Sequence, residues 1–253
     1  MSMLDHTLIA QRYFFPVRAD VPDACLVPID EGHLTCWRSA PATSERPFLV
    51  CFHGNGELVS HWMGDFVRII QSMGFEVFLA EYRGYSGSHG EPQLGKMLDD
   101  IPAIFDAVGV PAERIAVWGR SVGSIFALEW VDKYPRTQAL ILESGIHDVA
   151  QRLLLRVNPE VELGCSTTDF VNEVLARCDH QKKLENYPQK SLHLHTIHDH
   201  IVGIKHAQLN AASAGDRARL VEFDQGDHNS IMAYNQRAYF QEMSAFLHEN
   251  FDL

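Results

Sequence analysis

The stretch RIAVWGRSVG at residues 114–123 carries the strongest fold signal in the chain. Residues 114–118 are mostly apolar and rich in strand-forming side chains, which predicts a buried strand. From residue 121 to Tyr134 the pattern becomes helical. A strand that is followed at once by a tight turn and a helix is the repeating unit of an α/β sheet.

Within this unit, the pattern G-x-S-x-G predicts a sharp turn that raises the hydroxyl of Ser121 above the end of the sheet. Gly119 and Gly123 lack the Cβ atoms that would collide with neighbouring backbone. The helix that follows points its positive N-terminal end at the serine. The alternative is an ordinary glycine-flanked turn, which the strand–turn–helix context disfavours. Ser121 is therefore our candidate nucleophile.

Strand and helix patterns alternate on both sides of this unit. Strands are predicted at residues 48–52, 75–80, 114–118, 139–142, 191–197 and 219–223, and helices at residues 58–73, 94–108, 121–134, 203–214 and 231–247. Such alternation specifies an α/β fold, with a mostly parallel sheet and helices on both of its faces. Two further strand patterns flank Asp30-Glu31-Gly32 at residues 25–29 and 33–37, which predicts a hairpin at an antiparallel edge.

The length and composition fit a single domain. The chain has 253 residues, of which 46% are hydrophobic and 21% charged, so we expect one domain over residues 1–253.

Residues 145–189 interrupt the alternation, with helical patterns at 149–157 and 170–184 and no strand. Ligands bind at the carboxyl ends of the strands in open α/β sheets. An insertion between two strands lies over those ends, so we predict a small helical cap there.

A serine nucleophile needs a base, and the base needs a carboxylate that orients it. In a sheet of this kind the acid and then the histidine follow the serine along the chain. His228 lies between the last predicted strand and the last helix, and Asp199 follows the strand before it. Asp227, next to the histidine, and Glu143, after an earlier strand, are alternative acids. We predict Ser121, Asp199 and His228 as the catalytic residues.

Acyl transfer also needs donors fixed around the developing oxyanion. The backbone N–H of Val122, at the start of the helix, is one candidate. The second is expected in the loop after the strand at residues 48–52, which reads HGNG at residues 53–56. Glycines on both sides of Asn55 let the backbone approach a substrate closely. We predict the N–H groups of Asn55 and Val122 as the oxyanion hole.

Together these motifs resemble the α/β-hydrolase superfamily, from about Phe48 to the end of the chain. The stretch EYRGYSGSHGEP at residues 81–92 is similar to the small-cap branch that includes Bem-like proteins and depalmitoylating thioesterases. The resemblance implies Ser121, Asp199 and His228 as nucleophile, acid and base.

The chain departs from this family pattern in three places. His195-Thr196 stands where the family often has His-Gly, and Gly203 stands near the position of a common proline. The cysteine-rich N-terminus of the depalmitoylases is also missing, so no membrane-lipid substrate is implied.

We therefore expect a serine hydrolase that cleaves a carboxylic ester or thioester through an acyl-enzyme on Ser121. Apolar side chains of the cap segment are available to bind an acyl or alcohol group, or to pack the cap: Leu153, Leu154, Leu155, Phe170, Val171, Val174 and Leu175. A peptidase or amidase with the same triad is an alternative, with Glu160, Glu162 or Glu173 holding the substrate amine. A non-catalytic binding protein of this fold is another.

Four of the fourteen histidines lie together at His193, His195, His198 and His200. Residues two apart on a strand share a face, so His193 and His195 are candidate metal ligands. A strand covered on both sides and the lack of an HExxH motif disfavour this reading. We predict no metal and no cofactor.

Charge and cysteine content limit the classes of binding partner and the cellular compartment that we expect. Lys and Arg sum to 21 and Asp and Glu to 33, a formal charge of −12, which disfavours nucleic acids and anionic membrane surfaces. Five cysteines without CxxC spacing indicate reduced thiols and a cytoplasmic location. No signal peptide, membrane span or lipid-anchor motif is visible. We expect a small-molecule acyl substrate, no nucleic acid and no stable membrane anchor, and leave the oligomeric state open.

Overall fold

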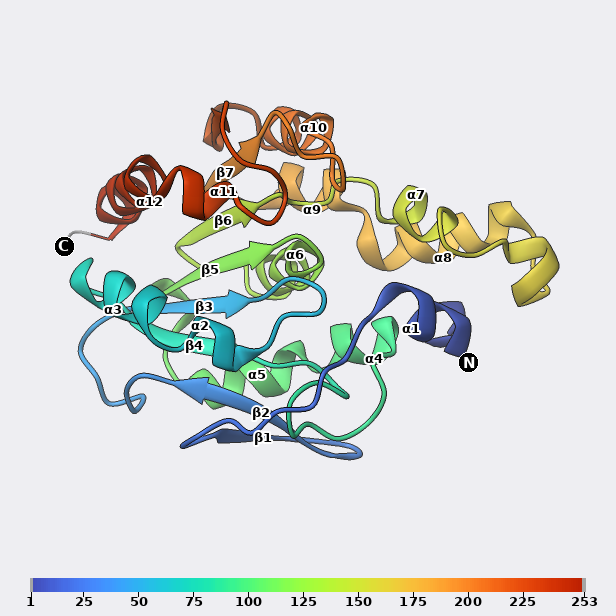
Figure 1. Cartoon of the computed structure of the whole chain (residues 1–253), viewed down its shortest axis with the longest axis horizontal. Coiled ribbons are helices and arrows are strands. Elements are labelled where there is room, and N and C mark those ends of the chain that lie inside the picture. Colours follow the sequence, from blue (N-terminus) through green and yellow to red (C-terminus); the bar gives the residue numbers. More distant parts are fainter. Residues whose placement is uncertain (1, 252–253) are drawn as a thin grey trace.

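An eight-stranded sheet forms the centre of the protein (Figure 1). The computed structural model describes residues 2–251. The strands lie in the order β1-β2-β4-β3-β5-β6-β7-β8. Their bounds are β1 (Cys25–Ile29), β2 (Gly32–Arg38), β3 (Phe48–Phe52), β4 (Glu76–Ala80), β5 (Ile115–Arg120), β6 (Ala139–Glu143), β7 (Lys190–Thr196) and β8 (Ala218–Phe223). Strands β3 to β8 are parallel, and β2 pairs antiparallel with both β1 and β4, which confirms the predicted mostly parallel sheet and its edge hairpin.

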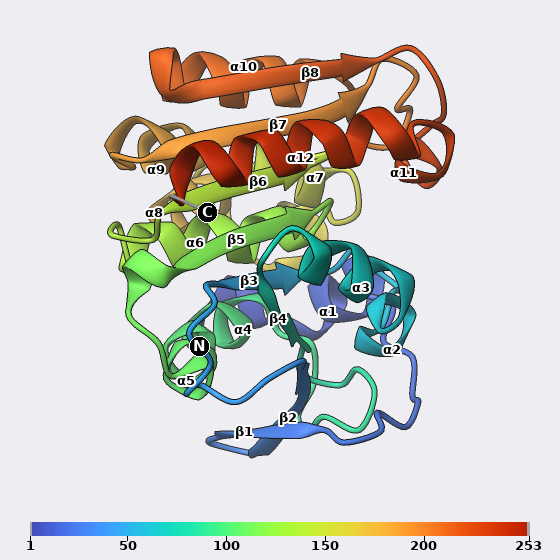
Figure 2. The ribbon, with the colours of Figure 1, turned by 90° about the vertical axis from the view of Figure 1, so that its left-hand side faces the viewer.

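Helices cover both faces of the sheet (Figure 2). Their bounds are α1 (Thr7–Tyr13), α2 (Val59–Trp62), α3 (Asp65–Ser72), α4 (Leu94–Asp99), α5 (Ile101–Val108), α6 (Gly123–Lys133), α7 (Val149–Leu154), α8 (Thr167–Cys178), α9 (His180–Asn186), α10 (Lys205–Ala214), α11 (Ile231–Tyr234) and α12 (Gln236–Asn250). Four short elements complete the set: η1 (Met3–Asp5), η2 (Ala112–Arg114), η3 (Pro159–Leu163) and η4 (Gly215–Arg217). Among these helices, none is long and apolar enough to cross a membrane.

Two hydrophobic cores form, one on each face of the sheet. Strand β3 supplies Phe48, Val50 and Phe52 to the core that also holds side chains of α4, α5 and α6. Its other residues, Leu49 and Cys51, point into the core with α3 and α12. Because successive side chains of a strand point to opposite faces, an unbroken apolar run such as FLVCF is buried on both sides.

Three of the helices predicted outside residues 145–189 are wrong in their continuity. The helix expected at residues 58–73 is divided into α2 and α3 at Gly64, whose φ of +122° is outside the helical region. The helix expected at 94–108 is divided into α4 and α5 at Asp100, just before Pro102, which has no backbone N–H to continue the helix. The last helix is likewise α11 and α12, which meet at Asn235.

The segment between β6 and β7 contains the helices α7, η3, α8 and α9, joined by short loops (Figure 1). Helices α7 and α8 extend beyond the sheet, whereas α9 packs against α6 and α10. The expected helix at 149–157 is shorter, and that at 170–184 is two helices that meet at Asp179. The short η3 and the N-terminal η1 and α1 were not predicted.

Candidate active site

Ser121 lies on the turn between β5 and α6, and its backbone adopts a φ of +53°, which is uncommon for a residue with a side chain. The turn is fixed by a hydrogen bond of 2.8 Å from the Ser121 N–H to the Glu143 carbonyl. A Cβ atom on Gly119 would come within 2.6 Å of the Ala127 Cβ, and one on Gly123 would clash with the Phe52 carbonyl. The two glycines are therefore required by close packing, as the motif predicted.

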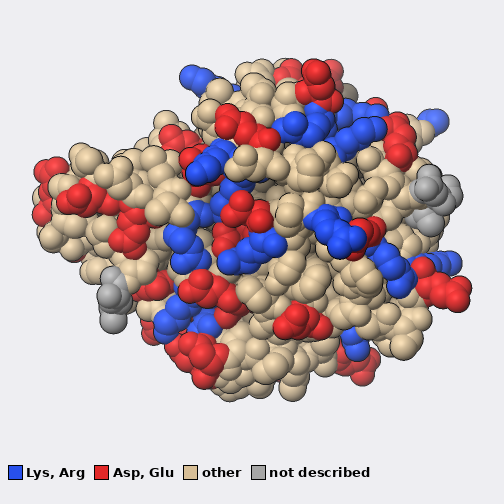
Figure 3. All heavy atoms as spheres, turned by 180° about the vertical axis from the view of Figure 1, so that it is seen from behind, with Lys and Arg blue, Asp and Glu red and all other residues tan. Residues whose placement is uncertain are grey.

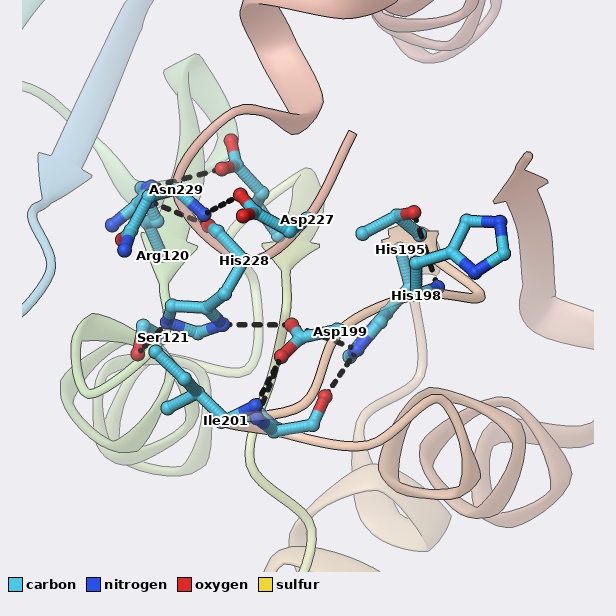
Figure 4. A network of polar contacts seen from close by, with 12 residues as sticks. Arg120, Ser121, His195, His198, Asp199, Ile201, Asp227, His228 and Asn229 are labelled. Atoms are coloured by element: carbon cyan, nitrogen blue, oxygen red, sulfur yellow. Dashed lines mark hydrogen bonds and ion pairs between the residues drawn. The ribbon is translucent and has the colours of Figure 1, made fainter. Parts of the chain in front are cut away.

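The structure brings Ser121, His228 and Asp199 into one hydrogen-bonded chain (Figure 4). His228 Nε2 is 2.9 Å from Ser121 Oγ, and His228 Nδ1 is 2.7 Å from Asp199 Oδ2. The three residues come from the β5–α6 turn and from the loops after β8 and β7. Because β7 and β8 are adjacent and parallel, their loops emerge at the same edge of the sheet. All three residues are at most 8% exposed.

Asp199 is held in an ionised state by its hydrogen bonds. Oδ1 accepts from the backbone N–H of Ile201 at 2.9 Å and of Val202 at 2.7 Å. Burial by itself would raise the pKa of Asp199, but hydrogen bonds from His195 and His228 outweigh it and hold the pKa well below its ordinary value. A carboxylate at Nδ1 fixes the tautomer in which Nε2 is free to accept the serine proton.

The two alternative acids have other partners. Glu143 is buried and accepts hydrogen bonds from Arg120 Nε at 2.9 Å and from the Tyr239 hydroxyl at 2.6 Å. Asp227 accepts from the Asn229 N–H at 3.0 Å and the Ser230 hydroxyl at 2.6 Å in an exposed turn. Asp199 is thus the candidate acid whose carboxylate contacts the imidazole.

Arg120, which the sequence analysis did not select, connects the site's loops. Its guanidinium donates to Glu143, to the carbonyl of His228 at 2.8 Å and to Glu57. Glu57 in turn accepts from the Gly54 N–H at 2.7 Å, in the loop that contains Asn55. The sequence signal that could have identified Arg120 was its charge, which is unexpected inside a turn motif that is otherwise buried.

The stretch EYRGYSGSHGEP at residues 81–92 holds the HGNG loop at residues 53–56 in place. Buried Glu81 lies 2.6 Å from His53 Nε2 and accepts from the Ser86 hydroxyl at 2.6 Å. Burial would lower the pKa of His53, but the Glu81 carboxylate outweighs it and raises the pKa. The hydroxyl of Tyr82 donates to the His53 carbonyl at 2.8 Å. These bonds fix the start of the HGNG loop.

Both predicted oxyanion donors line the cavity that contains Ser121 and His228. Within residues 2–251, the backbone N–H groups of Asn55 and Val122 donate to no protein acceptor. The Asn55 side chain has a different function, since its Oδ1 accepts from the Phe15 N–H at 2.9 Å and its Nδ2 donates to the Tyr13 carbonyl. Asn55 thereby holds the segment after α1 against the site.

The cavity at Ser121 has a volume of about 250 Å³. Tyr13 and Phe15 of the N-terminal segment form part of its wall, and Arg152 and Arg156 at the end of α7 form another part. Neither of these two parts of the wall was predicted from the sequence. Nothing in the local pattern around residues 13–15 or 152–156 says what they contact.

A second and larger cavity, of about 490 Å³, lies between α7, α8 and α9 and includes neither Ser121 nor His228 in its wall. The apolar residues expected in the cap are divided between two surroundings. Leu153, Phe170 and Val174 are buried in the core, whereas Leu154, Leu155, Val171 and Leu175 line this second cavity.

The histidines of the 193–200 segment do not act as one group. His193 is buried, lies 2.9 Å from the Ser191 hydroxyl, and has its pKa lowered to about 3 by burial. His195 Nε2 lies 2.6 Å from the Val202 carbonyl and 3.3 Å from Asp199 Oδ2. His198 and His200 are exposed. In the described part of the chain, no cluster of three or more His, Cys, Asp or Glu side chains could hold a metal ion.

Comparison with known proteins identifies the family of the chain. Residues 43–177 match the Hydrolase_4 family, described as serine aminopeptidase, S33. The chain is 24% identical to the uncharacterized protein YfhR of Escherichia coli, over 83% of this chain and 72% of YfhR. It is 28% identical to the protein bem46 of Schizosaccharomyces pombe, over 81% of this chain and 68% of bem46.

Solved structures share the fold at low sequence identity. The esterase Pf2001 of Pyrococcus furiosus superposes with a TM-score of 0.72 at 13% identity, covering 93% of this chain and 99% of the esterase. Est1E of Butyrivibrio proteoclasticus, solved with ferulic acid bound, superposes with a TM-score of 0.71 at 18% identity, covering 91% and 100%. Since the family match spans just over half of the chain, the protein belongs to the Hydrolase_4 (serine aminopeptidase S33) family of α/β-hydrolases and resembles the Bem-like proteins.

Proposed function

We propose that this α/β-hydrolase cleaves a carboxylic ester or thioester through an acyl-enzyme on Ser121. The observation that carries the proposal is the chain of contacts from Ser121 Oγ to His228 Nε2 at 2.9 Å and from His228 Nδ1 to Asp199 Oδ2 at 2.7 Å. Both distances are within hydrogen-bond range, and all three side chains belong to chemically suitable types.

In the first half of the reaction, Ser121 Oγ attacks the acyl carbon and His228 Nε2 accepts the serine proton. The ionised Asp199 stabilises the imidazolium that forms. The oxyanion of the tetrahedral intermediate receives hydrogen bonds from the N–H groups of Asn55 and Val122. The intermediate then collapses, and His228 returns the proton to the departing alcohol or thiol.

In the second half, water enters and His228 Nε2 accepts its proton. The hydroxide oxygen attacks the acyl carbon, the bond to Ser121 Oγ breaks, and the proton returns to the serine. The product is the free acid. The reaction as written needs no metal and no cofactor.

The charge of the cavity favours an ester or thioester over an aminopeptidase substrate. An aminopeptidase holds the substrate's cationic amine with a carboxylate, but no Asp or Glu of the described chain lines this cavity. The three candidate carboxylates have other partners: Glu160 accepts from Thr167, Glu162 pairs with Arg12, and Glu173 accepts from Ser2.

A labelling and turnover experiment tests this proposal. We expect a fluorophosphonate probe to label the wild type and Ser213→Ala, a matched serine variant on α10, but not Ser121→Ala. The turnover of p-nitrophenyl esters should fall by about 10⁴–10⁶-fold in Ser121→Ala and should persist in EDTA. Undiminished turnover in Ser121→Ala would refute the nucleophile, and preference for aminoacyl p-nitroanilides would favour the peptidase.

We also propose that the protein acts in the cytoplasm. All five cysteines are free, and Cys36, Cys51 and Cys178 are buried. Burial raises the pKa of the Cys36 and Cys51 thiols, which keeps them protonated and unreactive. Buried free thiols are typical of reducing compartments. Fractionation of cells that express the protein, followed by immunoblotting, tests the location.

A further inference from the structure

The cavity at Ser121 has a charge opposite to that of the protein as a whole. The chain carries a formal charge of −12. Yet the residues of the described chain that line the cavity include Arg120, Arg152 and Arg156 and no carboxylate. On the face seen in Figure 3, acidic side chains gather on the projecting helical segment, so its outside and its cavity wall differ in charge.

The three arginines differ in their partners. Arg120 is compensated, because it forms ion pairs with Glu57 and Glu143. Arg152 and Arg156 form no ion pair with any described residue. Arg152 is half-buried, and its Nε is shielded from solvent without an acceptor. A buried guanidinium N–H without an acceptor is costly, and an anionic ligand in the cavity would supply the missing acceptor.

The backbone places Arg152 and Arg156 four residues apart at the end of α7. Leu155 N–H donates to the Gln151 carbonyl at 3.2 Å and Arg156 N–H to the Leu153 carbonyl at 2.8 Å, so the chain stays coiled to Arg156. Residues four apart on a coiled turn lie side by side, and like charges there repel. An anion between the two guanidinium groups would relieve that repulsion.

The neighbouring groups do not neutralise these arginines. Burial raises the pKa of Tyr13 to about 12, so its hydroxyl remains uncharged at neutral pH. His206 is a neighbour of Arg152, and burial followed by the charge of Arg152 lowers the pKa of that imidazole. The Asp148 carboxylate, four residues before Arg152, accepts from the Gln151 N–H at 2.8 Å as the cap of α7 and forms no ion pair with Arg152 within the described residues.

We propose that Arg152 and Arg156 form the anion-recognition site of the substrate pocket, so that the preferred ester or thioester bears a carboxylate or phosphate. This inference rests on the proposed function and specifies its substrate class. Guanidinium groups bind both kinds of anion through paired N–H donors. The cavity volume of about 250 Å³ suits a short acyl or alcohol group that ends in the anion.

Matched p-nitrophenyl esters test the inference. The neutral hexanoate is compared with the adipate monoester, the 6-phosphonohexanoate and the cationic 6-(trimethylammonio)hexanoate. We expect kcat/KM of the wild type to be about tenfold or more higher for an anionic ester than for the hexanoate, mainly through KM. The ratio between the adipate and phosphono esters identifies which anion the site prefers.

The variants assign that preference to the two arginines. In Arg152→Gln/Arg156→Gln, the ratio of kcat/KM between the anionic esters and the hexanoate should be close to one. In Arg156→Glu, kcat/KM should be higher for the cationic ester than for the anionic esters. Lys182→Gln/Arg237→Gln is the matched control, since both side chains are exposed, lie outside the cavity and remove the same charge. Exposed Arg156 is also substituted alone, in case loss of Arg152 impairs folding.

The outcomes separate this inference from the proposed function. If the hexanoate is hydrolysed but anionic esters are no better, or if the control loses the preference equally, the inference is wrong and the hydrolase assignment stands. If no ester is hydrolysed, the proposed function fails. Calorimetric titration of adipate into the wild type and Arg152→Gln/Arg156→Gln then tests the anion site alone, and equal or absent binding overturns it.

Discussion

Arg120 donates a hydrogen bond of 2.8 Å from Nη2 to the backbone carbonyl of His228. Arg120 directly precedes Ser121, so this bond joins the turn of the nucleophile to the loop of the base without involving the reacting atoms. The same guanidinium pairs with Glu143 and Glu57. We therefore interpret Arg120 as a positioning residue for the site.

Replacement of Arg120 by Met is expected to destabilise the protein by about 3–5 kcal/mol, because Glu143 would remain buried without its cation. Urea denaturation of both proteins measures this change. The exposed Arg219 is the control, because its pairs with Glu242 and Glu249 are partly solvated, and Arg219→Met should cost at most about 1 kcal/mol. Equal losses in the two variants would contradict the role given to Arg120.

Substitution of the acid separates Asp199 from Glu143. Asp199→Asn should lower kcat by roughly 10⁴, because the amide favours the wrong tautomer of His228. Glu143→Gln removes a charge beside Arg120 and should act mainly on stability. Steady-state kinetics at equal temperature, with circular dichroism to verify folding, compares the two. If Glu143→Gln lost kcat while Asp199→Asn kept it, Glu143 and not Asp199 would be the acid.

Asn55→Ala should release the N-terminal segment from the site while leaving the backbone N–H at position 55 in place. The Asn55 side chain holds the Phe15 N–H at 2.9 Å and the Tyr13 carbonyl, so both bonds are lost. We expect faster tryptic cleavage after Arg12 or Arg18 and a larger change in KM than in kcat. Tyr85→Phe removes a hydroxyl that donates to Asn55 Oδ1 at 2.9 Å and accepts from the Phe15 N–H at 3.0 Å. It leaves both bonds of the Asn55 side chain to the segment in place and should have a weaker effect. Unchanged cleavage in Asn55→Ala would show that other contacts hold the segment.

The buried His193 predicts a loss of stability in acid. Its pKa is about 3 in the folded protein and about 6.5 in an unfolded chain, so between these values the unfolded state binds one more proton. The free energy of unfolding should therefore fall as the pH falls from about 6.5 toward 3, by at most about 1.4 kcal/mol per pH unit from this residue.

His193→Leu should accordingly flatten the pH dependence of unfolding, measured with urea between pH 6.5 and 4.5. His200→Leu is the matched control, because His200 is exposed and should leave the slope unchanged. The same slope in wild type and His193→Leu would mean that His193 is protonated in the folded protein.

The sequence alone determined the alternation of strands and helices and the elbow at Ser121. These features depend on residues that are neighbours along the chain. An apolar run such as FLVCF predicts a strand that is buried on both faces. The glycines at 119 and 123 are needed because a Cβ atom at either position would clash near the turn. The order of Ser121, Asp199 and His228 also follows from the order of the strands. Helix continuity was harder to predict, because Gly64 breaks an apolar pattern that otherwise continues.

Which polar groups meet in the site depends on how the elements pack. Asp199 and Asp227 follow strands and Glu143 ends β6, so the choice depends on where each side chain points at the end of its strand. The Tyr13 carbonyl accepts from the Asn55 side chain, and Arg152 lines the same cavity as Ser121, so segments that are far apart in sequence meet there. Their own local patterns are those of ordinary helix ends. A local pattern encodes which face of an element is apolar, but contacts between polar side chains depend on the packing of all the elements between them.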